Sequence, residues 1–415
     1  MTNTSLSSSE RHSMATDSNA GPPCGAAPSH SLSGERGMTL SVTDEQRLLR
    51  ENAERFLEEN APVTQLRELR DSNDAQAFRS EVWRQIVQQG WPGIASAAEH
   101  GGSELGHVGL GILMESVGRT LCASPLQATV SMGIPWLAHG ATSEAHRAVL
   151  RSAIAGETLL ALAIQEQSYF SPQEIATFAE DVGDHVRLSG RKVNVLDVGV
   201  ADQFIVLARL WQGSPESGLT AFLIDARTAG LTLRRVHSVD SRHVGQLDLH
   251  NVIVPYSSII GERGVVAATL DKVEDIVAAH ASAELLGISR RTFELTCEYL
   301  KSRVQFGVRI GSFQALQHRA AHLFAQLELG SSIVLAALTA LDTDAKNSSR
   351  LASAAKAKLC QVSQTAVGEA IQMHGGIGVT DDLDIGLYLK RAKVLEQFFG
   401  GESYHINRFA RRSGY

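Results

Sequence analysis

The spacing of apolar residues divides the chain into three stretches of different texture. From residue 39 to residue 157, apolar side chains recur at helical spacing, first over residues 48–57, with Thr43 or Asp44 placed to cap the first turn. Further helices are predicted over residues 81–89, 108–121, 126–139 and 143–154. The first stretch is therefore predicted to be an all-helical domain.

Between residues 158 and 262 the pattern changes to short runs of β-branched and aliphatic residues separated by turn residues. Strands are predicted over residues 186–188, 192–195, 204–208, 219–224, 231–236 and 246–254. Because no helical pattern interrupts them, these strands predict a compact antiparallel sheet or barrel.

From residue 263 to residue 415 the pattern is helical again, over segments longer than most globular helices. The segments are 265–302, 312–342, 349–374 and 386–399. Long helices with short connections are typical of a four-helix bundle. The whole chain thus predicts an α+β fold: an N-terminal helical domain, a middle antiparallel β-barrel or sheet domain and a C-terminal four-helix bundle.

Residues 1–38 differ from the rest in composition. They are rich in Ser, Gly, Pro and Ala, with almost no large apolar side chains, so burial cannot offset the entropy of ordering them. We expect a disordered tail, and the stretch lacks the apolar segment of a secretory signal.

Composition and charge argue against several classes of function. A net charge of -7 argues against nucleic acid as the main partner, because phosphate binding needs a clustered basic surface. No apolar run reaches the roughly 20 residues of a membrane span, so none is expected. The 4 cysteines form no CxxC pair, which argues against a disulfide framework or a zinc site. Reduced cysteines in a cytoplasm are the simplest interpretation.

The glycine-rich run over residues 106–111 is similar to a phosphate-binding loop in composition. No strand precedes it, and its spacing is not that of the dinucleotide fingerprint. Close packing at the start of a helix is the preferred interpretation.

The run from Arg303 to Gln314 reads RVQFGVRIGSFQ and joins the first two long helices. A helix hairpin explains its glycines, and Ser312 can cap the next helix. A helix hairpin does not explain why a guanidinium and an aromatic ring lie three residues apart, at Arg303 and Phe306. Arginine presents a planar fork of donors that suits a pyrophosphate.

This run resembles the R-x-x-F-G-x-x-I-x-x-F-Q signature of acyl-CoA dehydrogenases, with every position filled. A second run, residues 372–380, resembles the Q-x-x-G-G-x-G-[FYV]-T turn of the same family. The α, β, bundle order also matches, so the resemblance covers residues 39–415. It implies an FAD-dependent enzyme in which Arg303, Phe306 and Gln314 contact the pyrophosphate and adenine side of the cofactor.

The second motif implies an oligomer. By resemblance, Gln372, Gly375 and Gly376 meet the FAD of a neighbouring subunit, and the glycines let the backbone approach it. Because the cofactor site would then span two chains, we expect a homo- or hetero-oligomer, with a tetramer as the expected form. For His374 the preferred interpretation is a histidine at a helix C-terminus that satisfies free carbonyls.

The middle segment departs from the family in both of its flavin strands. The first usually reads T-E-P, and here residues 165–167 read QEQ, so Gln165 can offer an amide in place of a hydroxyl. The second usually reads K-x-W-I-T-N, and here residues 192–197 read KVNVLD. The Trp and Thr that shield and hydrogen-bond the flavin are missing.

Dehydrogenating an acyl-CoA thioester requires a carboxylate base for the α-proton and donors for the thioester carbonyl. The family usually places this Glu in a Y-E-G-T turn, at the position of Phe399, or in some members on the first bundle helix, at the position of Val277. Both positions are altered here. Glu274 and Glu402, each three residues away from one of them, are the substitutes expected. Each could instead be a solvated or helix-start carboxylate.

The altered C-terminal pattern resembles a bacterial subgroup that includes small subunits of two-gene enzymes, such as those acting on pimeloyl-CoA or steroid side-chain thioesters. The leading prediction is an acyl-CoA dehydrogenase polypeptide that passes electrons to an electron-transfer flavoprotein, alone or as half of a heterotetramer. An oxidase-like flavoenzyme and a non-catalytic FAD-holding subunit are the alternatives. No motif fixes the acyl group, which depends on pocket shape among the helices and the loops near Leu110 and Pro125.

Overall fold

The computed structural model describes residues 42–72, 78–210 and 218–415, so the predicted tail lies outside the described residues. The first stretch is helical, as predicted: α1 (Asp44–Asn60), α2 (Val63–Ser72), α3 (Ser80–Gln88), α4 (Gly106–Thr120), the π-helix η3 (Leu126–Gly133), α5 (Ile134–Gly140) and α6 (Glu144–Ile154). Thr43 caps α1 in a capping box, since its hydroxyl accepts from the Gln46 N–H and the Gln46 side chain accepts from the Thr43 N–H.

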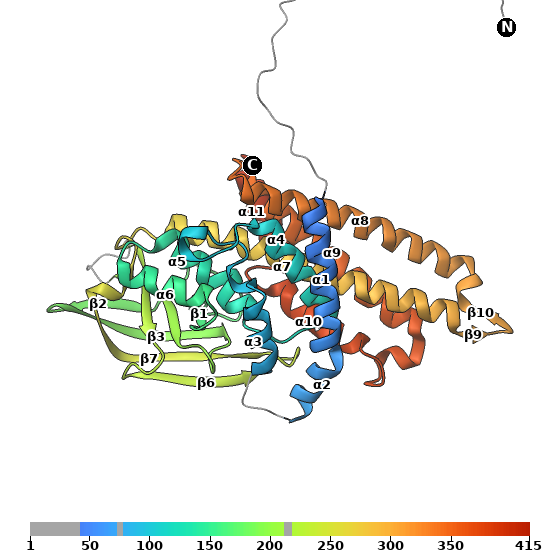
Figure 1. Ribbon diagram of the computed structural model, residues 1–415, viewed down its shortest axis with the longest axis horizontal. Coiled ribbons are helices and arrows are strands. Elements are labelled where there is room, and N and C mark those ends of the chain that lie inside the picture. The colour runs from blue at the N-terminus through green and yellow to red at the C-terminus, as the bar shows by residue number, and fades with distance from the viewer. Residues whose placement is uncertain (1–41, 73–77, 211–217) are drawn as a thin grey trace, which may run out of the picture. The chain divides into compact units, whose positions relative to one another are not determined.

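The middle stretch forms one eight-stranded sheet (Figure 1). Its strands are β1 (Leu160–Ala163), β2 (Phe178–Val182), β3 (His185–Leu196), β4 (Gln203–Leu210), β5 (Leu219–Asp225), β6 (Leu231–His237), β7 (His243–Pro255) and β8 (Ile259–Ile260). The order is β6-β7-β3-β2-β4-β5-β8, with β1 paired to β4. The sheet is open and mostly antiparallel, which confirms the sheet form of the prediction, and only the pairs β1–β4 and β2–β4 are parallel among the described strands.

The central strand β4 is buried on both faces. Ile205 and Leu207 join the core shared with the helices, whereas Phe204 and Val206 join a second core with β3 and β7. Alternate side chains of a strand point to opposite faces, so this double burial accounts for its continuous apolar run.

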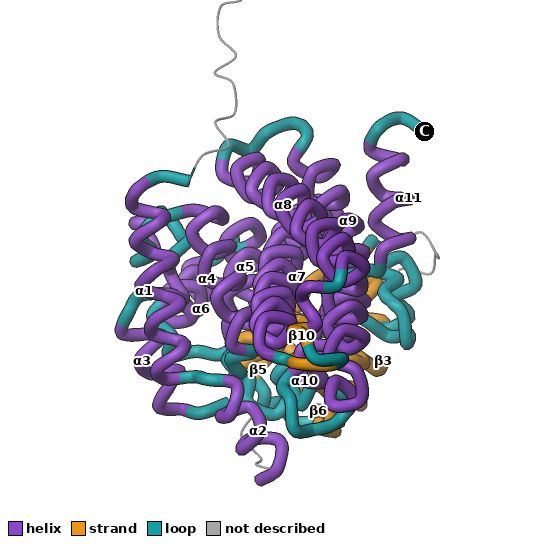
Figure 2. The backbone as a smooth tube through the Cα atoms, turned by 90° about the vertical axis from the view of Figure 1, so that its right-hand side faces the viewer, coloured by secondary structure: helices purple, strands orange, loops and turns teal. Residues whose placement is uncertain are grey.

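The last stretch is built on three long helices, α7 (Ala267–Ser302), α8 (Gln314–Asp342) and α9 (Ser348–His374), followed by α10 (Ile385–Gln397) and α11 (Glu402–Arg412). Figure 2 shows α7, α8 and α9 side by side. The fifth helix, α11, was not predicted. Ser312 does not cap α8 as expected, because its hydroxyl donates back to the Arg309 carbonyl at 2.7 Å.

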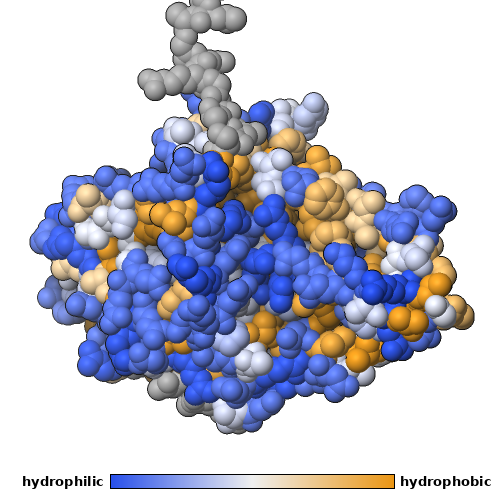
Figure 3. Space-filling model, turned by 45° about the vertical axis from the view of Figure 1, so that its right-hand side comes forward, coloured by the Kyte–Doolittle hydropathy of each residue, from blue (hydrophilic) through white to orange (hydrophobic). Residues whose placement is uncertain are grey.

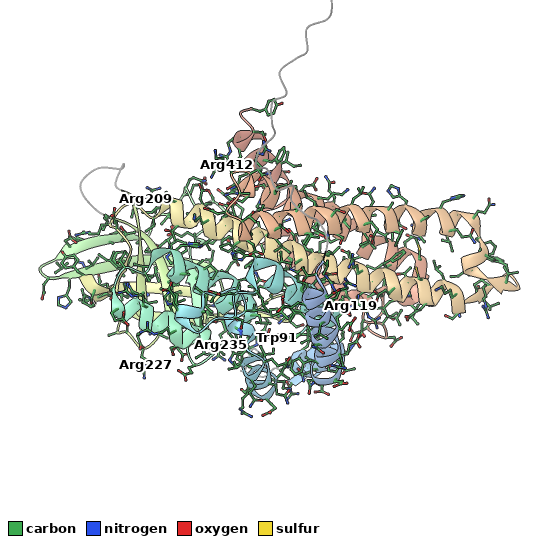
Figure 4. All side chains as sticks on the ribbon, turned by 45° about the horizontal axis from the view of Figure 1, so that its top comes forward. Trp91, Arg119, Arg209, Arg227, Arg235 and Arg412 are labelled. Carbon is green, nitrogen blue, oxygen red and sulfur yellow. The ribbon has the colours of Figure 1, made fainter. Side chains whose placement is uncertain are left out.

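Two glycines bring α4 and α7 into close contact. A Cβ on Gly118 would lie 2.2 Å from the Glu284 carbonyl oxygen, and one on Gly287 would lie 1.9 Å from the Glu115 carbonyl oxygen. Arg119, labelled in Figure 4, adds an ion pair to Glu294 of α7 at 2.8 Å.

The run over residues 106–111 begins α4 and packs closely, in agreement with the preferred interpretation. The Asp342 carboxylate accepts the backbone N–H groups of His107 and Val108. A Cβ on Gly111 would lie 2.3 Å from Leu338. A protein carboxylate thus occupies the helix N-terminus that a phosphate would need.

One helix in the described part of the chain, α8, is long and apolar enough to cross a membrane by length and composition alone, contrary to expectation. Of its most apolar 18-residue window, 44% is buried, and the helix packs against α7 and α9. A core helix of a bundle passes the same test of length and hydropathy.

Candidate functional site

A cavity of about 750 Å³ lies where the sheet meets the last two helices. One wall is formed by α10, α11 and the turn between them, and the other by β3, the start of β7 and the segment after β1. Its lining residues include Gln127, Gln165, Tyr169, Phe170, Asn194, Asp240, Arg242, Arg391, Phe398, Glu402 and Tyr404. This volume is in the range of cofactor and small-molecule sites.

The turn between α10 and α11 has left-handed backbone at two successive residues. The φ angle is 54° at Phe399 and 99° at Gly400. His405 Nε2–H donates to the Phe399 carbonyl at 3.0 Å, and the Lys356 ammonium donates to the carbonyls of Gly400 at 2.9 Å and Glu396 at 3.2 Å. Both basic side chains are fully buried, so the turn is held from inside the protein.

The Phe399 side chain belongs to an aromatic cluster. It stacks on Phe170 at 4.9 Å between ring centroids, and Phe170 meets Tyr404 edge-on at 5.4 Å. Val277, the other position where the family places its base, is fully buried on α7. Aromatic and aliphatic packing therefore fills both positions.

Glu274 lies behind the cavity rather than in its wall. It is 3% exposed, its Oε1 lies 2.9 Å from Arg408 Nε, and it is hydrogen-bonded to Tyr404, which does line the cavity. Burial raises the pKa of Glu274 to about 7, although Arg408 and Tyr404 act to lower it. Glu274 is thus connected to the cavity wall through its hydrogen bond with Tyr404.

Glu402 lies in the cavity wall, in the first turn of α11. It is half-buried, and the Gln361 side-chain amide donates to its Oε1 at 2.6 Å. Of the two candidate bases, Glu402 is the one with direct access to the cavity.

The segment after β1 places Gln165 in the cavity wall, where its side-chain N–H and its backbone carbonyl are hydrogen-bonded within the protein. Its side-chain amide donates to the Gln167 carbonyl at 2.8 Å, and its backbone carbonyl accepts the Val193 N–H at 2.7 Å. Next to it, Glu166 and Lys192 form a buried ion pair at 2.6 Å. Burial lowers the pKa of Lys192 to about 8, against the effect of Glu166.

A buried charge cluster lies at the base of the cavity. Arg391 pairs with Asp240 at 2.8 Å and with Glu284 at 2.7 Å. Arg242 donates to two backbone carbonyls just after α4, at 2.7 and 3.1 Å. Asp197 Oδ2 has no hydrogen-bond partner within the described residues, and burial raises the pKa of this carboxyl to about 7 despite Arg242 and Arg391.

The first sequence motif forms an exposed hairpin at the far end of α7 and α8 (Figure 1). Strands β9 (Val304–Gln305) and β10 (Val308–Arg309) are joined by Phe306 and Gly307, both with positive φ, as in a type I′ turn. Phe306 is 92% exposed, and Figure 3 shows apolar side chains on the surface at this end. The side chains of Arg303 and Gln314 are exposed and have no ion pair or hydrogen bond within the described residues.

The second motif lies at the same end of the bundle. Tyr299 of α7 stacks on His374 of α9 at 4.4 Å, and His374 Nδ1–H donates to the Ala370 carbonyl at 2.7 Å, as expected of a histidine that ends a helix. Gly375 and Gly376 follow in the open, since a Cβ at either would meet nothing within 4 Å. Gln372 is also exposed. None of the six predicted motif residues lines the cavity.

Comparison with known proteins identifies the family to which the chain belongs. The profile of the acyl-CoA dehydrogenase N-terminal domain matches residues 43–157, and that of the C-terminal domain matches residues 277–414. The chain belongs to the acyl-CoA dehydrogenase family, whose members are FAD-dependent oxidoreductases acting on acyl-CoA.

Similar proteins match over nearly the whole chain. The short/branched chain specific acyl-CoA dehydrogenase of Rattus norvegicus mitochondria is 26% identical, covering 89% of this chain and 86% of that protein. The caffeyl-CoA reductase-Etf complex subunit CarC of Acetobacterium woodii is 26% identical, covering 87% and 96%. A solved structure, a variant of the Tcur3481-Tcur3483 steroid ACAD, has a TM-score of 0.80 at 26% identity, covering 90% and 99%.

The residues present fit FAD. The exposed Arg303 guanidinium suits a pyrophosphate, and the open backbone at Gly375 and Gly376 leaves room for a dinucleotide to approach. The cavity is large enough for a flavin ring together with part of a substrate.

Sequence reasoning missed the residues that support the cavity from inside, above all Lys356 and Arg391. A signal existed for Lys356, because it shares the helical stripe of Ala352, Leu359 and Ser363, all of which are buried. A charged residue on the apolar face of a helix implies a buried partner.

Proposed function

We propose that this chain is a cytoplasmic acyl-CoA dehydrogenase polypeptide that forms an α,β-enoyl thioester and passes electrons to an electron-transfer flavoprotein, as one subunit of a hetero-oligomer. The observation that carries the proposal is the 750 Å³ cavity, whose wall contains Glu402 while Phe399 and Val277 fill the family's two base positions. The relation to a subunit of a reductase-Etf complex supports the electron partner.

In this proposal Glu402 removes the α-proton of the bound thioester. FAD, when bound, supplies the hydride acceptor. The aromatic cluster of Phe170, Phe399 and Tyr404 excludes water from one side of the cavity, which strengthens electrostatic interactions there. The turn held by Lys356 and His405 fixes the position from which α11 presents Glu402.

A partner-subunit role without catalysis is the second candidate. This role is favoured by the same aromatic cluster, because Phe399, stacked on Phe170, occupies the position where the family has its catalytic carboxylate. In such a hetero-oligomer the partner chain would provide the base, and this chain would hold FAD through Arg303 and the open glycines at residues 375 and 376.

The test is to purify the chain alone, record its visible flavin spectrum and add a panel of acyl-CoA thioesters. Bleaching that Glu402→Gln abolishes and Glu274→Gln leaves largely intact would support Glu402 as the base. Bound flavin that no thioester reduces would favour the partner-subunit role. A colourless protein would exclude the solitary enzyme, and co-expression with a neighbouring paralogue would then be the decisive comparison.

A further inference from the structure

A small pocket of about 10 Å³ adjoins the 750 Å³ cavity on the side of the buried charge cluster. The lining residues that the two spaces have in common are Gln127, Leu196, Arg242 and Arg391. A water molecule needs roughly 10–15 Å³, so the small pocket has room for one molecule of that size and is too small for a flavin ring. Gln127, which comes from the helix η3, borders both spaces.

Three side chains that line the small pocket have buried polar atoms without a hydrogen-bond partner among the described residues. Both amide atoms of Gln127 are in this condition, and so are Asp197 Oδ2 and Arg242 Nε. Gln127 is 5% exposed, and Asp197 and Arg242 are each 8% exposed. Buried polar groups in native proteins nearly always have a partner, so three such groups around one pocket call for a bound molecule.

These atoms match the hydrogen-bonding pattern of one water molecule. The side-chain N–H groups of Gln127 and Arg242 donate, and the Gln127 side-chain carbonyl accepts. The carboxyl of Asp197 accepts when it is ionised and donates when it is protonated, and a water can pair with either form. An amide can donate to a water and accept from the same water, so one molecule satisfies both Gln127 atoms. Buried waters typically make about three hydrogen bonds to groups that would otherwise be unsatisfied.

The other charged groups at the small pocket are already paired. Arg391 donates to the two carboxylate oxygens of Glu284 at 2.7 and 3.1 Å, and to Asp240 at 2.8 Å. Two guanidinium groups in the lining disfavour a cation, and the carboxylates of Asp197 and Glu284 disfavour an anion. The pocket therefore suits a small uncharged molecule that both donates and accepts.

We propose that the small pocket binds one structural water molecule, which is hydrogen-bonded to Gln127, Asp197 and Arg242 and fixes the Gln127 side chain in the wall of the larger cavity. The water links the cavity wall to the buried carboxyl of Asp197. The site requires neither an acyl group nor a reaction, so it stands apart from the proposed function.

The same water acts on the ionisation of Asp197, because a hydrogen bond donated to a carboxylate favours its charged form. Burial raises the pKa of Asp197 to about 7 despite Arg242 and Arg391, and the water opposes this rise. Removing the Gln127 amide would loosen the water, so the pKa should rise further. The other titratable groups packed around Asp197 and the pocket are Cys122, Asp240, His243 and Glu284.

The first experiment is a high-resolution crystal structure of the wild-type protein. One solvent peak should lie in the small pocket, about 2.7–3.2 Å from polar atoms of Gln127, Asp197 and Arg242. Ordered walls without a peak would overturn the proposal, as would a direct hydrogen bond from the Gln127 amide to Asp197. A guest contacted only by oxygen atoms would be a cation and would overturn it too.

The second experiment measures the coupling between Gln127 and Asp197 in solution. The stability advantage of Asp197→Asn over its parent grows with pH and levels off at the folded-state pKa of Asp197, near pH 7 in the wild-type parent. In a Gln127→Met parent, which keeps the length of the side chain and lacks the amide, this point should move up by about one pH unit. That is about a tenfold change in the acid constant, the lower end of what one hydrogen bond to a charged group contributes.

Ser131→Ala is the matched control. It removes a buried hydroxyl of the same helix that also has no partner among the described residues but lines neither space, so the levelling point should stay near pH 7. An unchanged point in the Gln127→Met parent, or an equal shift in the Ser131→Ala parent, would overturn the link between Gln127 and Asp197. Because the wild-type crystal structure involves no substitution, misfolding of a variant cannot hide a negative result there.

The groups around Asp197 that were named above are unchanged in every parent. Their own titrations therefore cancel when Asp197→Asn is compared with its parent, and the shift reports the carboxyl of Asp197 alone.

Discussion

Asp197 provides the sharpest test of the buried charges beneath the cavity. The substitution Asp197→Asn keeps the shape of the side chain and removes its ability to ionise. Asparagine also tolerates the left-handed backbone at this position, where φ is 56°. The change therefore isolates the free energy of holding a buried carboxylate.

The expected magnitude follows from the pKa. Burial raises the pKa of Asp197 from 3.8 to about 7, a difference of roughly three units, or about 4 kcal/mol at about 1.4 kcal/mol per unit. Because the folded-state pKa is raised, the stability that protonated Asp197 provides is fully present below its unfolded value and is lost as pH rises through 7. An asparagine at this position does not ionise and would not undergo this loss. The variant should therefore be more stable by about 4 kcal/mol above pH 8 and about equal near pH 4.

Calorimetry of wild type and variant between pH 4 and pH 8.5 would measure this difference as a shift in Tm. For an ordered region of this size, about 4 kcal/mol corresponds to a rise of about 5 °C. Glu274 titrates over a similar range, but it is present in both proteins and cancels in the difference. Asp382→Asn, the same substitution at an exposed carboxylate, is the matched control. A variant that is less stable at pH 8, or whose advantage is independent of pH, would refute the reasoning.

Three further substitutions test other parts of the structure. Arg391→Met should lower stability by about 3–5 kcal/mol, because two buried carboxylates lose their partner; an unchanged Tm would contradict the ion pairs at 2.8 and 2.7 Å. Lys356→Met should cost about 1–3 kcal/mol by leaving buried carbonyls unsatisfied, whereas Lys358→Met on the same helix should cost less, and thermal unfolding would compare them. Arg303→Ala should weaken FAD binding about tenfold or more without changing the Tm of the apoprotein; unchanged affinity in a flavin-fluorescence titration would remove Arg303 from the cofactor site.

The order of helical and strand segments could be predicted from the sequence because periodicity reports local burial. The double burial of β4 could not, since its continuous apolar run does not say which neighbours cover each face. The parallel pairing of β1 with β4 depends on contacts distant in sequence and left no local signal. The turn at Phe399 was predicted from the sequence, but the helix α11 after it was not. This helix is short and mostly polar, and it buries only two side chains, His405 and Arg408.

Some residues of the candidate site could likewise be predicted from the sequence, and others could not. The motif residues Arg303 and Gly375 could be found because a short contiguous pattern carries them. The relation between Glu274 and Tyr404 could not be found, since 130 positions separate them and only the tertiary fold brings these two side chains together. In the sequence, Glu274 and Glu402 each lie three residues from one of the family's base positions, so neither could be preferred. The structure distinguishes them, because Glu402 lines the cavity and Glu274 does not.

The left-handed backbone at Phe399 limits the evolutionary routes open to this protein. The positive φ at this position should strongly disfavour β-branched residues, and loss of the buried Phe399 ring should disfavour small ones. A glutamate there would also place its carboxylate against the ring of Phe170. A return to the family's usual base would therefore put a carboxylate inside an aromatic cluster, where its desolvation is unfavourable unless a second change opens the cluster to water.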